Sequence, residues 1–178
     1  MAEAMLKATE DILRDEGYAA LTSRRVSEYV GVKQRLVYYY FATMDDLIIE
    51  SFRRLAIRDL ERLRTSVSSD RPLHDIWDIC INTADSRLVA EFMALANRNE
   101  GLREEVVKFI EESRNIQVSA IKRALDAGSG NKELKPIAIA LLGTSVALAL
   151  NREAAIGVTK GHQTVKRLIK QFCDSLES

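Results

Sequence analysis

The sequence predicts an all-α protein in which a small N-terminal helical domain precedes a larger helical body. Ala, Leu, Glu, Lys and Arg are abundant, whereas the 178 residues include only 2 Pro and 8 Gly. This composition favours helices over strands and turns. Apolar residues also recur at the helical spacing of three and four positions along most of the chain. The hydrophobic content of 47% is sufficient for a substantial core.

Residues that start or stop helices divide the chain into expected segments. Gly17 and Gly31 stand where a helix can end, because glycine readily adopts the left-handed conformation of a C-cap. Thr22 and Ser23 can each cap the second helix through a side-chain hydroxyl. The expected helices cover residues 2–16, 24–30, 32–41, 45–65, 73–85, 88–97, 102–127, 136–156 and 162–176.

Two breaks separate groups of these helices. The polar stretch 65–70 is followed by Pro72, which suits the first turn of a new helix. Gly128, Ser129 and Gly130 form the second break. We therefore expect a head over residues 1–46 and a body over residues 47–178, with a helix over about 45–65 that connects them.

Charge and cysteine content exclude several classes of protein. The chain has 26 Lys and Arg residues and 26 Asp and Glu residues, so its net charge is zero. Any contact with nucleic acid must therefore come from a local basic surface. Cys80 and Cys173 fit neither a metal site nor a disulfide framework, and no other cofactor motif is present. The N-terminus lacks the layout of a signal peptide, and the uncharged stretch 137–150 is shorter than the roughly 20 residues of a membrane span. We expect a cytoplasmic protein without a membrane partner, in which 137–150 belongs to a buried helix.

The second and third helices have the pattern of a helix-turn-helix. Gly31 stands where the chain must turn sharply between them. Val26, Val30 and Val32 can pack inward with Val37 and Phe41, which lie four positions apart on one helical face. In this motif the second of the two helices lies in the major groove of DNA.

The third helix carries residues that suit contact with DNA. Lys33, Gln34 and Arg35 occupy its first turn; Lys and Arg match the two acceptors of guanine, and Gln matches the donor and acceptor of adenine. The hydroxyls of Tyr38–Tyr40 can bond phosphate oxygens. Residues 22–41 carry four cations and one anion, a local charge of +3. On these residues alone, a solvated surface turn remains an equally open interpretation.

A set of correlated positions resembles the DNA-binding domain of the TetR family of regulators. These positions are Gly17–Tyr18, Thr22, Val30–Gly31–Val32, Tyr38–Phe41 and Asp46–Leu47. The resemblance covers about the first quarter of the chain. It implies a DNA-binding domain over 1–46 and an effector-binding and dimerisation domain over 47–178. It further implies a homodimeric repressor on pseudo-palindromic double-stranded operator DNA, released by a small apolar or amphiphilic effector.

The resemblance also implies roles for individual residues. Those implied to contact bases are Arg24, Lys33, Gln34, Arg35 and Leu36. Those implied to contact phosphates are Thr22, Ser23, Tyr38, Tyr39 and Tyr40. Met44 departs from the family pattern, which often has a phosphate-binding lysine there. Leu36 replaces a commonly small residue, and either contact with a thymine methyl or inward packing fits it.

The last two helices are expected to form a dimer interface. The helix over 136–156 is apolar on nearly every face and must be covered, and 162–176 carries one apolar stripe. The two helices could bury each other within one chain or pair with their copies across a two-fold axis, and the family precedent favours the second. The expected interface residues are Leu142, Val146, Leu150, Val165, Leu168, Ile169 and Phe172.

The resemblance places an effector pocket in the body. The candidate lining residues are Trp77, Cys80, Phe92, Met93, Asn97 and Phe109. An aromatic and Met-lined cavity with a few polar groups suits an apolar or amphiphilic ligand. Ordinary core packing is the alternative, because aromatic residues at helical spacing commonly fill a core.

Two other classes of function compete with a regulator. An enzyme is disfavoured because only His74 and His162 could act as bases near neutral pH and no catalytic motif is present. A helical small-molecule carrier or protein-interaction module without sequence-specific DNA binding is the main alternative. The lysine and arginine at positions 33 and 35 disfavour it, because protein interfaces are depleted in lysine.

Overall fold

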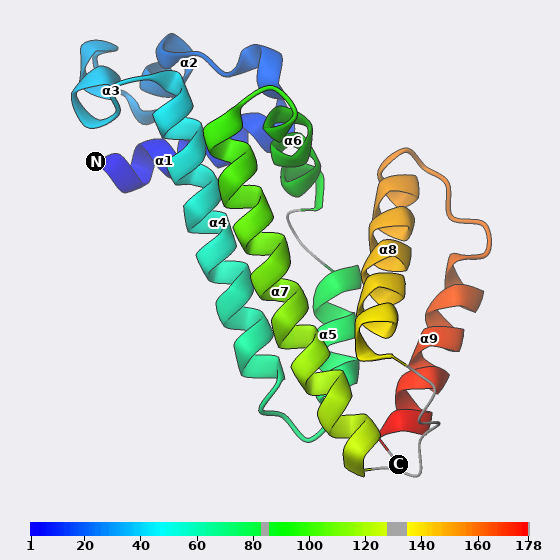
Figure 1. The fold of residues 1–178 in the computed structure, drawn as a ribbon. Coiled ribbons are helices and arrows are strands. Elements are labelled where there is room, and N and C mark those ends of the chain that lie inside the picture. The colour runs from blue at the N-terminus through cyan, green and yellow to red at the C-terminus, as the bar shows by residue number, and fades with distance from the viewer. Residues whose placement is uncertain (83–85, 128–134, 178) are drawn as a thin grey trace. The chain divides into compact units, whose positions relative to one another are not determined.

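The computed structural model describes residues 1–82, 86–127 and 135–177, and every regular element in them is a helix, which confirms the all-α prediction (Figure 1). The elements are α1 (Ala2–Asp15), the 3-10 turn η1 (Tyr18–Ala20), α2 (Ser23–Val30), α3 (Arg35–Tyr40), α4 (Met44–Ser66), α5 (Pro72–Ile81), α6 (Ser86–Ala96), α7 (Glu100–Ala127), α8 (Pro136–Ala155) and α9 (His162–Leu176). The expected break at Gly128–Gly130 lies outside the described residues.

The third helix begins later than the sequence predicts, at Arg35 rather than Val32. Gly31 ends α2 with φ 75°, and its N–H bonds to the carbonyl of Glu28. The N–H of Val32 bonds to the carbonyl of Ser27 at 2.9 Å. This pair of bonds is a Schellman motif, in which Val32 closes the preceding helix and cannot start the next. The expected fifth helix also differs, since α5 ends at Ile81.

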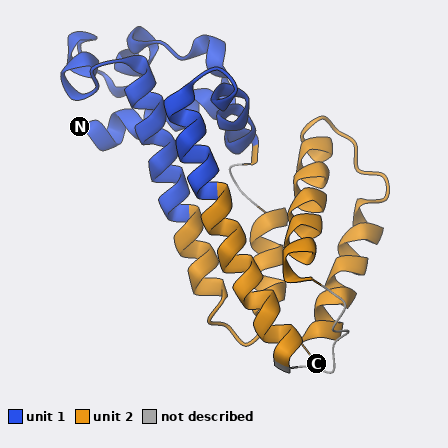
Figure 2. Ribbon diagram, viewed as in Figure 1, with its two compact units in different colours: residues 1–58, 87–109 blue, residues 59–86, 110–178 orange. Residues whose placement is uncertain are grey.

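The chain divides into two compact units that differ from the expected head and body (Figure 2). One comprises residues 1–58 and 87–109, and the other residues 59–86 and 110–178. The long helices α4 and α7 therefore each contribute to both units. A functional boundary at residue 46 remains a prediction, because packing units and functional domains need not coincide.

Aromatic packing forms part of the core of the first unit. Phe52 of α4 meets Phe92 of α6 and Phe109 of α7 edge-on, with ring centroids 5.3 and 5.8 Å apart. Phe52 and Phe92 are fully buried. Edge-to-face contacts of this kind add to the stabilisation that the buried apolar area provides.

The second unit has two clusters of buried apolar residues. The first joins α4, α5, α7, α8 and α9 through Leu63, Leu73, Ile76, Ala120, Ile121, Ala140, Cys173 and Leu176. The second joins α5 to α8 through Trp77, Ile81, Ala147 and Leu150. Both clusters use the same narrow face of α8, which carries its small residues Ala140 and Ala147.

The expectation that residues 137–150 form a buried helix is wrong for the chain by itself. Helix α8 is long and apolar enough to cross a membrane by length and composition, yet only 17% of its apolar window is buried. Leu142 is 67% exposed, and Leu148 is exposed as well. The difference arises because one face of α8 packs within its unit, whereas the sequence is apolar on the other faces too.

Candidate nucleic-acid interface

The turn between α2 and α3 presents the expected DNA-reading residues to solvent. Thr22 caps α2, since its side-chain oxygen accepts a hydrogen bond from the N–H of Arg25 at 3.1 Å. Lys33, Gln34 and Arg35 are all exposed at the start of α3. Val26, Val37 and Phe41 are buried, as the spacing predicted, whereas Val30 and Val32 are only half-buried. The short α3 is thus held to its unit by one apolar face while its first turn remains accessible.

Three of the predicted DNA contacts bond to one another instead of standing apart. The side-chain Nε2 of Gln34 donates to the hydroxyl oxygen of Ser23 at 2.7 Å. The hydroxyl of Tyr38 donates to the same oxygen at 3.1 Å. Ser23 itself is only 6% exposed. Sequence reasoning missed this network because residues 11 and 15 positions apart meet only once the turn has formed.

Acidic partners neutralise two of the four local cations. Arg24 pairs with Glu28 one turn further along α2, at 2.8 Å. Arg25 forms two hydrogen bonds with Glu16, at 2.6 and 3.0 Å. These bonds lower the pKa of Glu16, because they favour its charged form.

Lys33 and Arg35 are the two cations of this surface without an acidic partner among the described residues. No neighbouring carboxylate in the described part of the chain therefore competes with a phosphate or a base edge for these two side chains. Of the local charge of +3 that the sequence predicts, two positive charges without acidic partners in the described ranges lie at Lys33 and Arg35, where the chain enters α3.

The three tyrosines occupy different positions on α3. Tyr39 is 77% exposed, and its ring meets that of Tyr40 edge-on at 5.1 Å. Tyr38 is also exposed, although its hydroxyl is held by Ser23. Leu36 is half-buried, so its geometry leaves open both roles that the sequence allows.

The start of α4 is stabilised by a capping box. The N–H of Asp46 donates to the hydroxyl oxygen of Thr43 at 3.0 Å, and the N–H of Thr43 donates to the carboxylate of Asp46 at 2.9 Å. This reciprocal pair satisfies two N–H groups that a helix start leaves unpaired. The half-buried Met44 stands where the family pattern often has a lysine.

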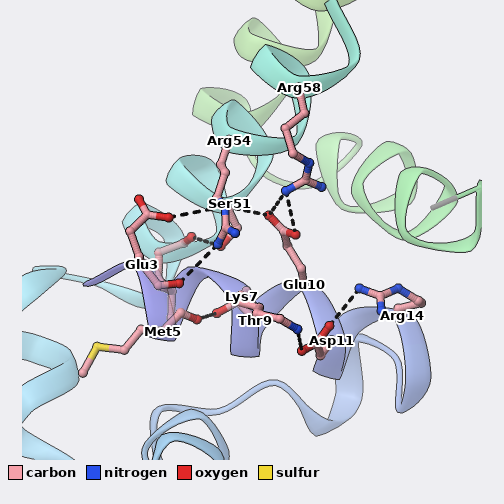
Figure 3. Close-up of polar contacts among 11 residues, drawn as sticks. Glu3, Met5, Lys7, Thr9, Glu10, Asp11, Arg14, Ser51, Arg54 and Arg58 are labelled. Atoms are coloured by element: carbon pink, nitrogen blue, oxygen red, sulfur yellow. Dashed lines mark hydrogen bonds and ion pairs between the residues drawn. The ribbon is translucent and has the colours of Figure 1, made fainter. Parts of the chain in front are cut away.

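Polar contacts from α1 hold α2 and α4 in place within the first unit. The carboxylate of Glu10 accepts two hydrogen bonds from Arg58 of α4, at 3.1 and 3.2 Å (Figure 3). Arg54 of α4 lies 3.8 Å from the same carboxylate. On α2, the Tyr29 hydroxyl donates to Asp11 at 3.1 Å. Helix α1 is therefore joined to both α2 and α4 by partly buried polar bonds.

The structure divides the expected pocket residues between the two units. Phe92 and Phe109 belong to the aromatic cluster around Phe52, with the half-buried Met93 and the exposed Asn97 nearby in sequence. Trp77 and Cys80 lie on α5 in the other unit.

Two polar groups on α5 distinguish this part of the expected pocket. The indole N–H of Trp77 is buried and has no hydrogen-bond partner among the described residues. Burial raises the pKa of the Cys80 thiol to about 11, which keeps it uncharged near neutral pH. The pocket remains a prediction.

The expected interface residues differ in their exposure. Leu142 and Leu168 are 67% and 63% exposed, so they are available to a partner. Leu150 is buried against Trp77 and Ile81 within its own chain. The remaining four, all partly buried against the core clusters, are Val146, Val165, Ile169 and Phe172.

A capped helix, a Schellman turn and a short exposed second helix define the helix-turn-helix class. Residues 5–50 match the family model described as bacterial regulatory proteins, tetR family. Residues 5–50 therefore match the DNA-binding region of TetR-family proteins, and the fold of the chain is similar to that of solved TetR-family transcription regulators. A search of curated proteins finds no match.

Solved structures share this fold over nearly the whole chain. A TetR transcription regulator from Haloarcula marismortui has a TM-score of 0.82 at 21% identity, over 97% of this chain and 96% of its own. A transcriptional regulator from Saccharomonospora viridis in complex with choline has a TM-score of 0.85 at 13% identity, over 97% and 95%. SmeT, the repressor of a Stenotrophomonas maltophilia multidrug efflux pump, has a TM-score of 0.68 at 19% identity, over 88% and 79%.

Proposed function

We propose that this chain is a cytoplasmic, homodimeric transcriptional repressor that binds pseudo-palindromic operator DNA and is released by a small effector. The observation that carries the proposal is the entry to α3, where Lys33, just before the helix, and Arg35, its first residue, are exposed and without an acidic partner among the described residues. A TetR-family helix-turn-helix domain presents this turn. Exposed cations of this kind suit a surface that binds a polyanion such as DNA.

The proposed DNA contacts divide into those that read sequence and those that fix position. Lys33 and Arg35 match guanine, and Gln34 matches adenine. Arg24 can join them by exchanging Glu28 for DNA, since their ion pair is exposed and therefore weak. Thr22 and Tyr39 are exposed and suit phosphate contacts, which position the protein without reading bases.

The proposed dimer uses the uncovered apolar side chains of α8 and α9. These exposed residues are Ile137, Leu141, Leu142, Leu148 and Leu168. An apolar surface of this kind is costly in water and is stabilised when a second copy covers it. One short recognition helix reads few base pairs, whereas two copies one DNA turn apart, about 34–36 Å, read a pseudo-palindrome.

The proposed effector is a small apolar or amphiphilic molecule. The choline complex of the Saccharomonospora viridis protein and the repressor SmeT support a ligand-responsive repressor on this fold. A ligand that binds more tightly to the DNA-free state weakens operator binding by that difference, typically about 1–3 kcal/mol. The aromatic and sulfur-containing residues predicted to line a pocket suit such a ligand.

Selection of bound sequences from random double-stranded DNA tests the proposed function. The full chain should enrich a pseudo-palindrome with two half-sites separated by one helical turn or a multiple of it. The matched control is the double variant Lys33→Ala, Arg35→Ala, which should enrich no common sequence. Failure of the unaltered chain to enrich any sequence at low salt would favour the carrier or interaction module instead.

A further inference from the structure

The hydroxyl of Ser23 is the centre of a small, partly buried hydrogen-bond network at the start of α3. It accepts one hydrogen bond from Nε2 of Gln34 at 2.7 Å and one from the hydroxyl of Tyr38 at 3.1 Å. A serine oxygen has two acceptor sites, so these two donors occupy both of them. The side chain of Ser23 therefore has its acceptor capacity filled within the protein.

Burial argues against a phosphate contact as the main role of Ser23. The residue is 6% exposed, whereas the preceding Thr22 is exposed at the same helix start. Thr22 also provides the cap of α2, so Ser23 is not needed for that purpose. The remaining role of the Ser23 hydroxyl is to hold the side chains of Gln34 and Tyr38.

The bond to Ser23 selects one orientation of the Gln34 amide. With one N–H given to Ser23, the amide keeps its carbonyl oxygen and its second N–H for DNA, and this donor–acceptor pair matches adenine. A rotated amide would direct its oxygen to Ser23 and both N–H groups outward, which matches the two acceptors of guanine. Tyr38 donates to the same Ser23 oxygen at 3.1 Å, so both donors converge on one acceptor.

We propose that Ser23 is a positioning residue that sets the preference of Gln34 for adenine over guanine. This inference rests on the proposed function, since it requires that α3 read DNA. Ser23 acts through Gln34 and touches no base.

The test compares Ser23→Ala with the unaltered chain on the operator that selection yields. Operators that carry adenine or guanine are compared at the one base position where Gln34→Ala removes the preference between these two bases. Ser23→Ala should reduce the adenine-to-guanine preference there by about five-fold or more, because the amide can then rotate. Affinity for unrelated DNA, and the dependence of affinity on salt, should stay unchanged because no phosphate contact is lost.

Ser27→Ala is the matched control. Ser27 is a buried serine on the same helix, but its hydroxyl donates to the backbone carbonyl of Arg24 at 2.8 Å and contacts no reading side chain. This variant should keep the adenine preference. Circular dichroism of both variants should show an unchanged helix content, since Thr22 still caps α2.

A double variant separates positioning from direct contact. In the Gln34→Ala background, Ser23→Ala should have no further effect on base preference. An equal loss of affinity on all sequences, or a loss that persists without Gln34, would overturn the inference and assign Ser23 to the phosphates. A selected operator with unchanged preference in Ser23→Ala would overturn this inference alone, whereas the absence of any operator for the unaltered chain would overturn the proposed function as well.

Discussion

Glu10 of α1 and Arg58 of α4, which are 48 residues apart in sequence, form an ion pair. One guanidinium nitrogen of Arg58 donates to both carboxylate oxygens of Glu10, at 3.1 and 3.2 Å. The Glu10 side chain is only 5% exposed, and Arg54 reaches the same carboxylate (Figure 3). A carboxylate that is buried in this way depends on its cationic partners, because burial removes the water that would otherwise solvate it. The pair connects the first helix of the DNA-binding domain to the long helix that follows it.

Glu10→Gln should therefore destabilise the fold by about 1.5–3 kcal/mol, the range for hydrogen bonds to charged groups. Urea unfolding followed by circular dichroism measures this loss. Glu3→Gln is the control, because Glu3 faces Arg54 with a mostly exposed side chain and should cost less than about 1 kcal/mol. Equal effects of the two substitutions would show that the burial of Glu10 contributes nothing.

Arg35→Ala should weaken operator binding by about 1–3 kcal/mol and relax the preference at one base pair, since Arg35 is exposed and has no ion-pair partner among the described residues. Tyr39→Phe should instead weaken all sequences alike, because a phosphate contact carries no sequence information. Fluorescence anisotropy on operator and scrambled DNA measures both effects. Arg103→Ala, on α7, is the control. An Arg35→Ala variant with unchanged affinity and preference would rule out the proposed orientation of α3.

Affinity for DNA should fall steeply as salt increases. Each phosphate that the protein neutralises releases a counterion. The slope of log affinity against log salt concentration therefore becomes more negative by about 0.9 for each phosphate contact. Titrations at a series of potassium chloride concentrations give the slope for the unaltered chain. A flat response of the unaltered chain would favour the carrier or interaction module.

Leu142→Glu and Leu168→Glu should each shift the protein from dimer to monomer at micromolar concentration. Both leucines are mostly exposed in the single chain, and a glutamate carboxylate that is buried without a partner in an apolar interface costs several kcal/mol. Sedimentation velocity measures the change. Ile57→Glu is the control, because Ile57 is an exposed apolar residue of α4. An unaltered chain that sediments only as monomer would contradict the proposed dimer.

Asp11 should make the first unit sensitive to acid. Burial by itself would raise the pKa of this carboxyl, but hydrogen bonds from Lys7, Arg14 and Tyr29 outweigh burial and lower the pKa. Such a carboxyl stabilises the fold above its unfolded pKa of about 3.9, and the contribution disappears as pH falls through the lowered folded value.

The Asp11→Asn variant should consequently be less stable than the unaltered chain at pH 7, and the difference should shrink as the pH is brought below about 4. Urea unfolding at a series of pH values measures the difference. Asp15→Asn, on the exposed side of α1, serves as the control and should change stability little. A difference for Asp11→Asn that stays constant with pH would contradict the role assigned to its charge.

The fold class and most helix boundaries followed from local chemistry. Gly31 ends α2 and Pro72 begins α5 as predicted, because capping and backbone restrictions act within a few residues. The start of α3 was wrong by three residues, since the Schellman bond of Val32 depends on how the whole turn closes.

The sequence by itself determined the class of the protein: an all-α chain with a TetR-type helix-turn-helix whose first turn carries Lys33, Gln34 and Arg35. Only the tertiary structure decided how these groups are held. It buried Ser23 beneath Gln34, paired Arg25 with Glu16, and covered Leu150 while leaving Leu142 exposed. The physical reason is that helical periodicity identifies the faces of each helix, whereas burial and pairing depend on which face of a distant element meets it.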